Sequence, residues 1–200
     1  CIGDGAGALS WAKAALDRDE APHYSLIEIA RALILLGKLR EAAKYLDLAE
    51  EGALKDGREW VIAGVKYVNG LLELAEGRTL DGIESLEEAL EIFDRIKMDI
   101  HAVPCLIALA RAEVEKYDIS GDLDTSGPWM TKLEQRARER DYPGILMEHA
   151  LLKAEFQIKQ GASEAARKTL TDALDIYDSP SIRTLRKRIE ERFQSLMSDA

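Results

Sequence analysis

Apolar residues recur along the chain at intervals of three and four, the spacing that places them on one face of an α-helix. The spacing is clear at Leu26, Ile29, Ala30 and Leu33, at Ala42, Leu46 and Ala49, and at Ile182, Leu185, Ile189, Phe193 and Leu196. No segment alternates apolar and polar residues as a half-buried strand would. The pattern therefore predicts an all-α chain, with helices at residues 8–18, 22–37, 39–54, 58–76, 79–96, 102–117, 128–140, 143–160, 163–177 and 180–197.

All the prolines stand where the apolar periodicity pauses. Proline lacks an amide hydrogen and has a fixed φ, which suits the first turn of a helix. We therefore expect the prolines to mark helix starts: Pro22, Pro104, Pro128, Pro143 and Pro180.

Four glycines divide the chain at regular intervals. Gly37, Gly77, Gly121 and Gly161 are separated by 40, 44 and 40 residues, which indicates an internal repeat. Each is expected to end the first helix of a hairpin with positive φ, a conformation that glycine adopts without steric cost. Because the links are short, neighbouring helices should lie antiparallel, and a row of such hairpins stacks into a solenoid.

A small, large and small residue follow these glycines at plus five, plus nine and plus twelve. The sets are Ala42, Leu46 and Ala49; Gly82, Leu86 and Ala89; and Ala166, Leu170 and Ala173. We expect the small residues where the backbones of two helices approach closely and the leucine in the space between hairpins.

At these positions the chain resembles the tetratricopeptide repeat family. The first unit matches at all seven positions given above, and the third matches at Leu106, Leu109 and Ala110 before an expanded turn at 117–127. Polar residues replace large apolar ones in the second and fourth units, at Lys66, Asn69, Glu73, Lys153 and Gln157. The 40-residue spacing exceeds the family's usual ~34 and is similar to that of the longer arrays attached to signal-transduction ATPases and transcriptional activators.

The resemblance implies an α-α superhelix with a concave groove. Residues 1–21 are interpreted as a linker followed by the second helix of a preceding, truncated repeat, residues 22–177 as four hairpins, and residues 178–200 as a C-terminal capping helix. The first helix of each hairpin lines the groove in this family. The corresponding residues are Tyr24, Ile27, Arg31, Ile34, Tyr67, Leu71, Leu74, Ile107, Arg111, Val114, Glu148, Leu151, Glu155 and Ile158.

Composition narrows the choice of partner. The 27 Lys and Arg against 37 Asp and Glu give a net charge of −10, which repels nucleic acids and anionic membranes. Two cysteines are too few for a disulfide scaffold and fit a reducing compartment, so we place the protein in the cytoplasm. The longest apolar run, near residues 27–36, is too short to span a membrane.

Several short motifs carry potential chemistry. The segment GDGAGA at residues 3–8 lacks the preceding strand of a phosphate-binding loop, and we interpret it as a flexible linker. His101 and Cys105 share a helical face, but a zinc site needs about four ligands, so these two residues do not predict one. The Glu20-x-x-His23 motif occurs only once and is interrupted by proline, so no di-iron site is expected. We interpret the histidines, including His149, as structural.

The charged clusters are interpreted as solvated surfaces. They are an acidic stripe at Glu84, Glu87, Glu88 and Glu91, and a basic patch at Arg183, Arg186, Lys187, Arg188 and Arg192. No nucleophile-elbow serine is present. We expect neither catalysis nor a metal or other cofactor.

The sequence therefore predicts a non-catalytic scaffold that binds a protein or peptide through apolar groove residues, with Arg31 and Arg111 available for a carboxylate. Neighbouring units or a second copy of the chain could instead cover this groove. The alternative function is the sensory array of a transcriptional regulator or signalling ATPase, in which a small ligand or partner tilts adjacent hairpins.

Overall fold

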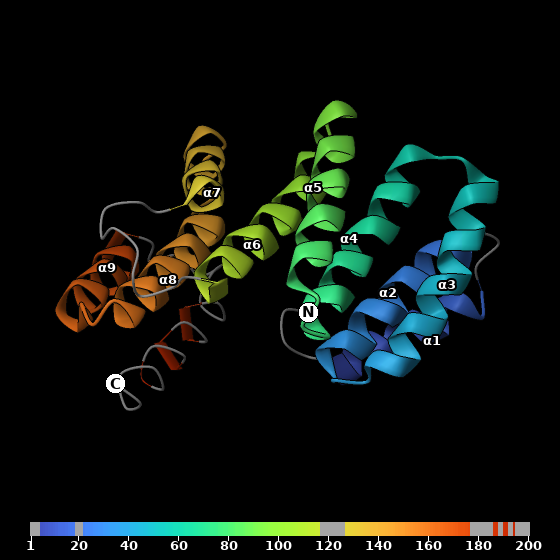
Figure 1. Cartoon of the computed structure of the whole chain (residues 1–200), viewed down its shortest axis with the longest axis horizontal. Helices are drawn as coiled ribbons and strands as arrows, with labels where there is room; N and C mark the ends of the chain where they lie inside the picture. Colours follow the sequence, from blue (N-terminus) through green and yellow to red (C-terminus); the bar gives the residue numbers. More distant parts are fainter. Residues whose placement is uncertain are drawn as a thin grey trace. The chain divides into compact units, whose positions relative to one another are not determined.

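The computed structural model describes residues 5–18, 22–116 and 127–176, together with residues 186, 187, 190, 191 and 194. Within these ranges all regular structure is α-helical (Figure 1). The helices are α1 (Gly5–Leu16), α2 (Pro22–Leu35), α3 (Leu39–Asp56), α4 (Glu59–Ala75), α5 (Thr79–Arg95), α6 (Asp99–Lys116), α7 (Pro128–Glu139), α8 (Pro143–Lys159) and α9 (Ser163–Ile176). The all-α prediction is confirmed.

Seven of these helices agree with the predicted ranges within two residues, whereas α1 and α6 each begin three residues earlier than predicted. Pro22, Pro128 and Pro143 are the first residues of α2, α7 and α8, as expected. Pro104 does not start a helix, because α6 already begins at Asp99, directly after the turn that ends α5. Pro180 and most of the predicted capping helix lie outside the described residues.

One type of turn ends five of the helices. Gly37, Gly77 and Gly161 have φ values of 70°, 81° and 74°, as predicted, and Lys97 and Asp141 adopt the same conformation at 58° and 52°. Gly121, the other predicted turn glycine, lies outside the described residues. In the first turn, the amide of Gly37 donates to the carbonyl of Ile34 and the amide of Lys38 donates to that of Leu33, both at 2.9 Å. The same two bonds recur after Glu73, Phe93, Ala137 and Gln157, so this Schellman arrangement satisfies helix-end carbonyls throughout.

The turns reveal a shorter period than the glycines alone indicate. Residues with positive φ stand at 37, 57, 77 and 97, and again at 141 and 161. A helix with its turn therefore occupies 20 residues, and two of them make the 40-residue repeat. Sequence analysis missed the shorter period because it did not single out Gly57 and because Lys97 and Asp141 are not glycines.

The chain forms two compact units, Cys1–Ala108 and Leu109–Ala200. In the first unit, α1 packs against α2, α2 against α3, α3 against α4, and α4 against α5. In addition, α2 packs against α4. In the second, α7 packs against α8 and α8 against α9. This mostly sequential packing is consistent with a helical repeat.

The predicted small and large positions lie in the cores of these units. Ala42, Leu46 and Ala49 are buried in the first unit, and Ala166, Leu170 and Ala173 are buried in the second. Such small side chains allow α3 and α9 to pack closely against the preceding helices.

The backbones of α4 and α5 also approach each other closely, at Gly70 and Gly82. A Cβ atom placed on Gly70 would lie 2.9 Å from the carbonyl oxygen of Gly82 and 2.7 Å from Cγ of Leu86. A Cβ atom on Gly82 would lie 2.9 Å from the carbonyl oxygen of Gly70. The two backbones therefore touch where both residues lack a side chain.

The polar residues that depart from the family pattern are paired across the same hairpin. Asn69 donates to the hydroxyl of Ser85 at 3.3 Å, and that hydroxyl donates to Glu73 at 2.7 Å. Glu73 is buried and also accepts a bond from Arg78 at 2.9 Å. Lys66 forms an ion pair with Glu88. Because buried polar groups need partners, α5 supplies polar residues where α4 has them.

In the α8–α9 hairpin, one polar residue at a position expected to be apolar is likewise paired with a polar residue of the neighbouring helix. The hydroxyl of Thr169 donates to the side-chain oxygen of Gln157 at 2.9 Å. Lys153, the other polar departure on α8, is exposed to solvent. The two hairpins thus accommodate the departures by pairing or by exposure.

Residues 5–8 are part of α1, so the interpretation of this segment as a flexible linker is wrong. A Cβ atom on the buried Gly5 would lie 3.0 Å from the side chain of Leu36. The glycine therefore allows the start of α1 to pack tightly against the end of α2, and this packing keeps the segment helical.

Side chains from other helices satisfy several helix ends in the second unit. Glu113 of α6 accepts a bond from the amide of Met130 in the first turn of α7, at 3.1 Å, while burial raises the pKa of Glu113. Lys159 donates to the carbonyl of Val114 at 2.9 Å, and Arg186 donates to that of Leu174 at 3.1 Å. These contacts compensate for backbone groups that a helix end leaves without partners.

The basic patch is described only at Arg186 and Lys187. These residues form ion pairs with Glu190 and Glu191. Nothing in this part of the patch indicates a separate binding surface.

No helix in the described part of the chain is long and apolar enough to cross a membrane.

Substitutions at two turn residues, Gly77 and Lys97, test whether positive φ at these positions favours glycine. Nothing lies within 4 Å of a Cβ atom on Gly77, so Gly77→Lys changes conformational energy without a clash and should lower the free energy of unfolding by ~1–2 kcal/mol. Lys97→Gly should raise it by ~0.5–1 kcal/mol, the relief of strain less the added backbone entropy. Urea unfolding measures both. If both substitutions changed the free energy of unfolding in the same direction, the left-handed conformation assigned to these residues would be contradicted.

Two substitutions on α4 test its close contact with α5. Gly70→Ala should lower the free energy of unfolding by ~1–3 kcal/mol because the methyl group meets backbone and Leu86. Gly64→Ala is the control, since its Cβ would meet only Cδ1 of Ile27, at an ordinary 3.5 Å, and alanine favours a helix by up to ~1 kcal/mol. Thermal and urea unfolding of both variants check the difference; a Gly70→Ala protein as stable as Gly64→Ala would exclude the tight crossing.

Candidate functional site

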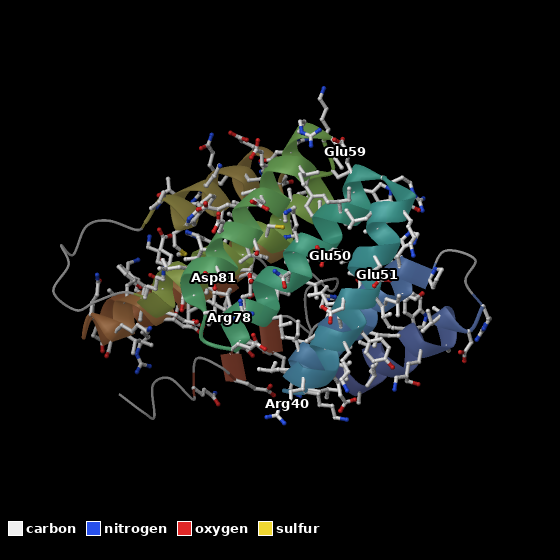
Figure 2. The ribbon with its side chains drawn as sticks, turned by 45° about the vertical axis from the view of Figure 1, so that its right-hand side comes forward. Arg40, Glu50, Glu51, Glu59, Arg78 and Asp81 are labelled. Atoms are coloured by element: carbon white, nitrogen blue, oxygen red, sulfur yellow. The ribbon has the colours of Figure 1, made fainter. Side chains whose placement is uncertain are left out.

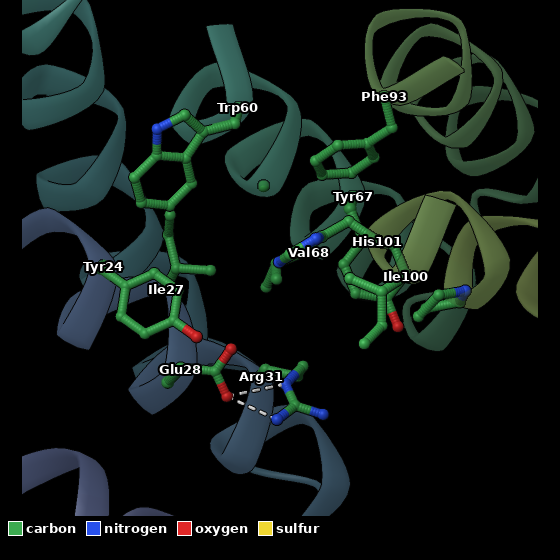
Figure 3. A pocket seen from close by; sticks show the side chains of 12 residues that line it. Tyr24, Ile27, Glu28, Arg31, Trp60, Tyr67, Val68, Phe93, Ile100 and His101 are labelled. Atoms are coloured by element: carbon green, nitrogen blue, oxygen red, sulfur yellow. Dashed lines mark hydrogen bonds and ion pairs between the residues drawn. The ribbon is translucent and has the colours of Figure 1, made fainter. Parts of the chain in front are cut away.

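A cavity of about 220 Å³ lies in the first unit (Figure 3). Its walls come from α2, α4, α5 and the start of α6. The lining residues are Tyr24, Ile27, Glu28 and Arg31 on α2; Trp60, Gly64, Tyr67 and Val68 on α4; Phe93 on α5; and Ile100, His101 and Pro104 on α6.

The repeat explains why these residues meet. Tyr24, Gly64 and Pro104 are separated by 40 residues each, and all three line the cavity. The same interval relates Trp60 to Ile100. Equivalent positions of successive first helices therefore face one space, as expected when the helices are stacked at a constant repeat.

Aromatic contacts position the walls. The rings of Tyr24 and Trp60 are 5.9 Å apart and tilted by 58°, and the guanidinium of Arg58 lies 5.1 Å from the centre of the Trp60 ring. On the other side, Phe93 stacks on His101 at 5.4 Å. These contacts hold the rings at the cavity edge.

Gly64 provides part of the space. Its position would contact only Ile27 if a Cβ were added, and no side chain projects from this point of α4. A larger residue here would extend into the cavity, which suggests that the open volume depends on this glycine.

One oppositely charged pair lies at one side of the cavity, away from the rings of Trp60 and Phe93 (Figure 3). Nε of Arg31 donates to Oε2 of Glu28 at 3.1 Å. Burial opposes the charge on Arg31, but the bond to Glu28 and the nearby carboxylate keep the pKa of Arg31 above its ordinary value. The site therefore contains one ion pair between a guanidinium and a carboxylate side chain.

Two phenols and the imidazole of His101 also belong to the polar lining. Burial raises the pKa of Tyr67 to about 12, and burial also raises the pKa of Tyr24. Both phenols stay protonated at neutral pH and can donate or accept a hydrogen bond. The site can thus bind and orient a molecule.

Four of the predicted groove residues come together in this cavity: Tyr24, Ile27, Arg31 and Tyr67. The other predicted residues of the first unit do not line it: Ile34, Leu71, Leu74 and Ile107. They are partly buried instead.

The predicted groove residues of the second unit differ in exposure. Arg111 is exposed, whereas Val114, Glu148 and Leu151 are buried. Glu155 and Ile158 are partly buried. Among the predicted groove residues of the second unit, Arg111 is thus the one that is exposed to solvent.

The sequence analysis missed Glu28, Trp60, Gly64, Val68, Phe93, Ile100, His101 and Pro104. Gly64 and Pro104 could have been found by adding 40 and 80 to Tyr24, a predicted groove residue. The other missed residues are not 40 residues from any predicted groove residue. Among them, Phe93 belongs to a second helix.

Two of the histidines lie beside carboxylates. Nε2 of His23 lies 3.3 Å from Asp56, and His149 lies 3.7 Å from Glu134, with a pKa lowered by burial. The buried Cys105 thiol donates to the carbonyl of His101 at 3.6 Å. Within the described ranges, no three His, Cys, Asp or Glu side chains are grouped to hold a metal ion.

The outer surfaces of α3 and α5 are charged and exposed. Figure 2 shows side chains such as Glu50, Glu51 and Asp81 projecting from these helices. The predicted acidic stripe on α5 is exposed along its whole length, and its Glu88 pairs with Lys66. The interpretation of the stripe as a solvated face is confirmed.

The chain matches no protein-family model, no curated protein and no solved structure. The functional assignment therefore depends on the geometry of the cavity and the helical repeat.

The thiol behind the cavity should be unreactive in the folded protein. Burial raises the pKa of Cys105 to about 12, so roughly one thiol in ten thousand is ionised at pH 8. In a Cys1→Ser variant, a thiol-specific disulfide reagent should release no signal until denaturant is added, and then one equivalent. Rapid reaction under native conditions would show that Cys105 is accessible.

Proposed function

We propose that this protein is a non-catalytic, tetratricopeptide-like scaffold that binds a peptide or partner helix in a groove formed by its first helices. The 20-residue helix-and-turn unit and the small residues at close helix contacts support this proposal. So does the packing of α2 against both α3 and α4, since a stacked array brings first helices of neighbouring hairpins together.

The observation that carries the proposal is the cavity shared by α2, α4 and α6. These are the first helices of three successive hairpins, the helices that the family resemblance assigns to the groove. A site with this construction can recognise side chains that project at regular intervals from a partner.

The lining suggests the chemistry of that partner. Apolar side chains such as Ile27 and Val68 and the aromatic rings provide contact area, and aromatic residues dominate binding energy in protein interfaces. Arg31 offers charge to a carboxylate. We therefore propose an apolar or aromatic anchor on the partner, with an acidic group beside it.

A second candidate function is the ligand-sensing array of a regulator or signalling ATPase. A concave, aromatic site with a few convergent polar groups favours it, because this is the usual composition of small-molecule sites. The volume, about 220 Å³, is below the ~300–1,000 Å³ of drug-sized ligand sites. Such a site would take a small metabolite.

Location in the cytoplasm remains part of the proposal and is based on the cysteine content. The predicted groove residues of the second unit, including Arg111, likewise remain predictions. They would extend the groove if the two units act together on one partner.

A matched pair of exposed residues tests the peptide-binding proposal. Ile100 and Leu80 are each the second residue of a helix, and they are 76% and 75% exposed, but Ile100 lines the cavity and Leu80 does not. Peptides selected from a random display library on the wild-type protein should bind Ile100→Asp at least ~10-fold more weakly, a loss of about 1.4 kcal/mol. Their affinity for Leu80→Asp should be unchanged.

Fluorescence anisotropy with the selected peptides measures both affinities. Failure to select any peptide, or equal affinities for the two variants, would argue against this groove as the peptide site.

A further inference from the structure

The charged pair in the cavity has unused bonding capacity on both partners. Arg31 donates to Oε2 of Glu28 through Nε and Nη2, and among the described residues no other hydrogen-bond partner contacts either side chain. A guanidinium has five N–H donors and a carboxylate has two oxygens. Nη1 of Arg31 and Oε1 of Glu28 therefore remain available for a ligand.

The pair is also accessible. The side chains of Arg31 and Glu28 are 38% and 22% exposed. Ion pairs of this type contribute little to stability in water, so a ligand that inserts between the two groups or binds beside them sacrifices little. Figure 3 shows the pair at the same cavity as the rings of Tyr24 and Trp60.

The rest of the lining requires an apolar ligand body. Trp60, Tyr67 and Phe93 contribute aromatic faces and edges, and Ile27 and Val68 contribute aliphatic surface. Within the described chain the hydroxyl of the partly buried Tyr67 makes no hydrogen bond, so it can bond to a polar group of a ligand. A ligand with an aromatic ring and a nearby polar group would satisfy both features.

We propose that this cavity binds a free aromatic L-amino acid, or a zwitterion of the same size and chemistry. Its carboxylate would bind Arg31, its ammonium group would bind Glu28, and its ring would lie among the aromatic side chains. This proposal rests on the second candidate function, in which the array senses a small ligand, and it names the class of that ligand.

Charge complementarity favours a zwitterion over a segment within a peptide. An internal peptide residue has neither a free ammonium nor a free carboxylate, and a peptide end has only one of them. Two opposite charges adjacent to one aromatic cavity match a molecule that carries all three features. The ligand would contact α2, α4 and α6 together, so its binding would depend on the packing of successive hairpins.

Isothermal titration calorimetry with L-phenylalanine and three analogues tests the proposal. Phenethylamine lacks the carboxylate, 3-phenylpropionate lacks the ammonium group, and glycine lacks the ring. L-Phenylalanine should bind, each one-charge analogue should bind at least ~10-fold more weakly, as expected for a lost charged hydrogen bond, and glycine should not bind.

Variants connect each charge to its residue. In Arg31→Gln, L-phenylalanine and phenethylamine should bind with similar affinity, because the carboxylate has lost its partner; in Glu28→Gln, L-phenylalanine and 3-phenylpropionate should do so. Lys38→Gln and Glu41→Gln are matched controls, since Lys38 and Glu41 form an exposed pair with the same three-residue spacing. Circular dichroism and thermal unfolding verify that all four variants are folded.

The outcomes separate this inference from the peptide proposal. Binding of L-phenylalanine with loss of discrimination in the two cavity variants supports the zwitterion site, whether or not peptides are selected by display. Selected peptides that are sensitive to Ile100→Asp, with no binding of L-phenylalanine, L-tryptophan or L-tyrosine, would overturn the zwitterion site and leave the scaffold proposal intact. Equal loss of binding in the Lys38→Gln and Glu41→Gln controls would also overturn it.

Discussion

The left-handed residue at the end of the helix is the constraint on which the rest of the structure depends. It reverses the chain within two or three residues, and in five of the turns its own amide and the next amide donate to two helix-end carbonyls. Because a left-handed residue returns every 20 residues over residues 37–97, each helix lies antiparallel to the next. The register of small and large side chains is then repeated in space as it is in the sequence.

Close packing between these helices depends on different solutions in different hairpins. The hairpin of α2 and α3 uses buried alanines at Ala42 and Ala49, whereas α4 and α5 meet through two glycines. The α4–α5 contact is accompanied by polar side chains around Glu73 and Ser85. These polar groups are stable in the interface because each has a partner, and an apolar replacement of Ser85 would remove the hydroxyl that Asn69 and Glu73 share.

The cavity is a consequence of the same periodicity. Positions 40 residues apart are brought to one surface, and there the chain has a glycine at 64 between Tyr24 and Pro104. The missing side chain leaves room, the aromatic contacts maintain the walls, and the Glu28–Arg31 pair adds two opposite charges. A row of helices with repeated packing thus forms an aromatic cavity through a few residues that break its pattern.

The sequence by itself determined the helical class, the positions of the helices and three of the turn glycines, because each depends on local geometry and on the spacing of apolar residues. It also predicted that Tyr24, Ile27, Arg31 and Tyr67 face one groove, and all four line the cavity. Only the tertiary structure revealed the left-handed turns at Lys97 and Asp141, where strain in a non-glycine residue is accepted to keep the hairpin register. It alone decided which groove positions face a cavity and which are buried, since exposure depends on the neighbouring helices that pack against each face.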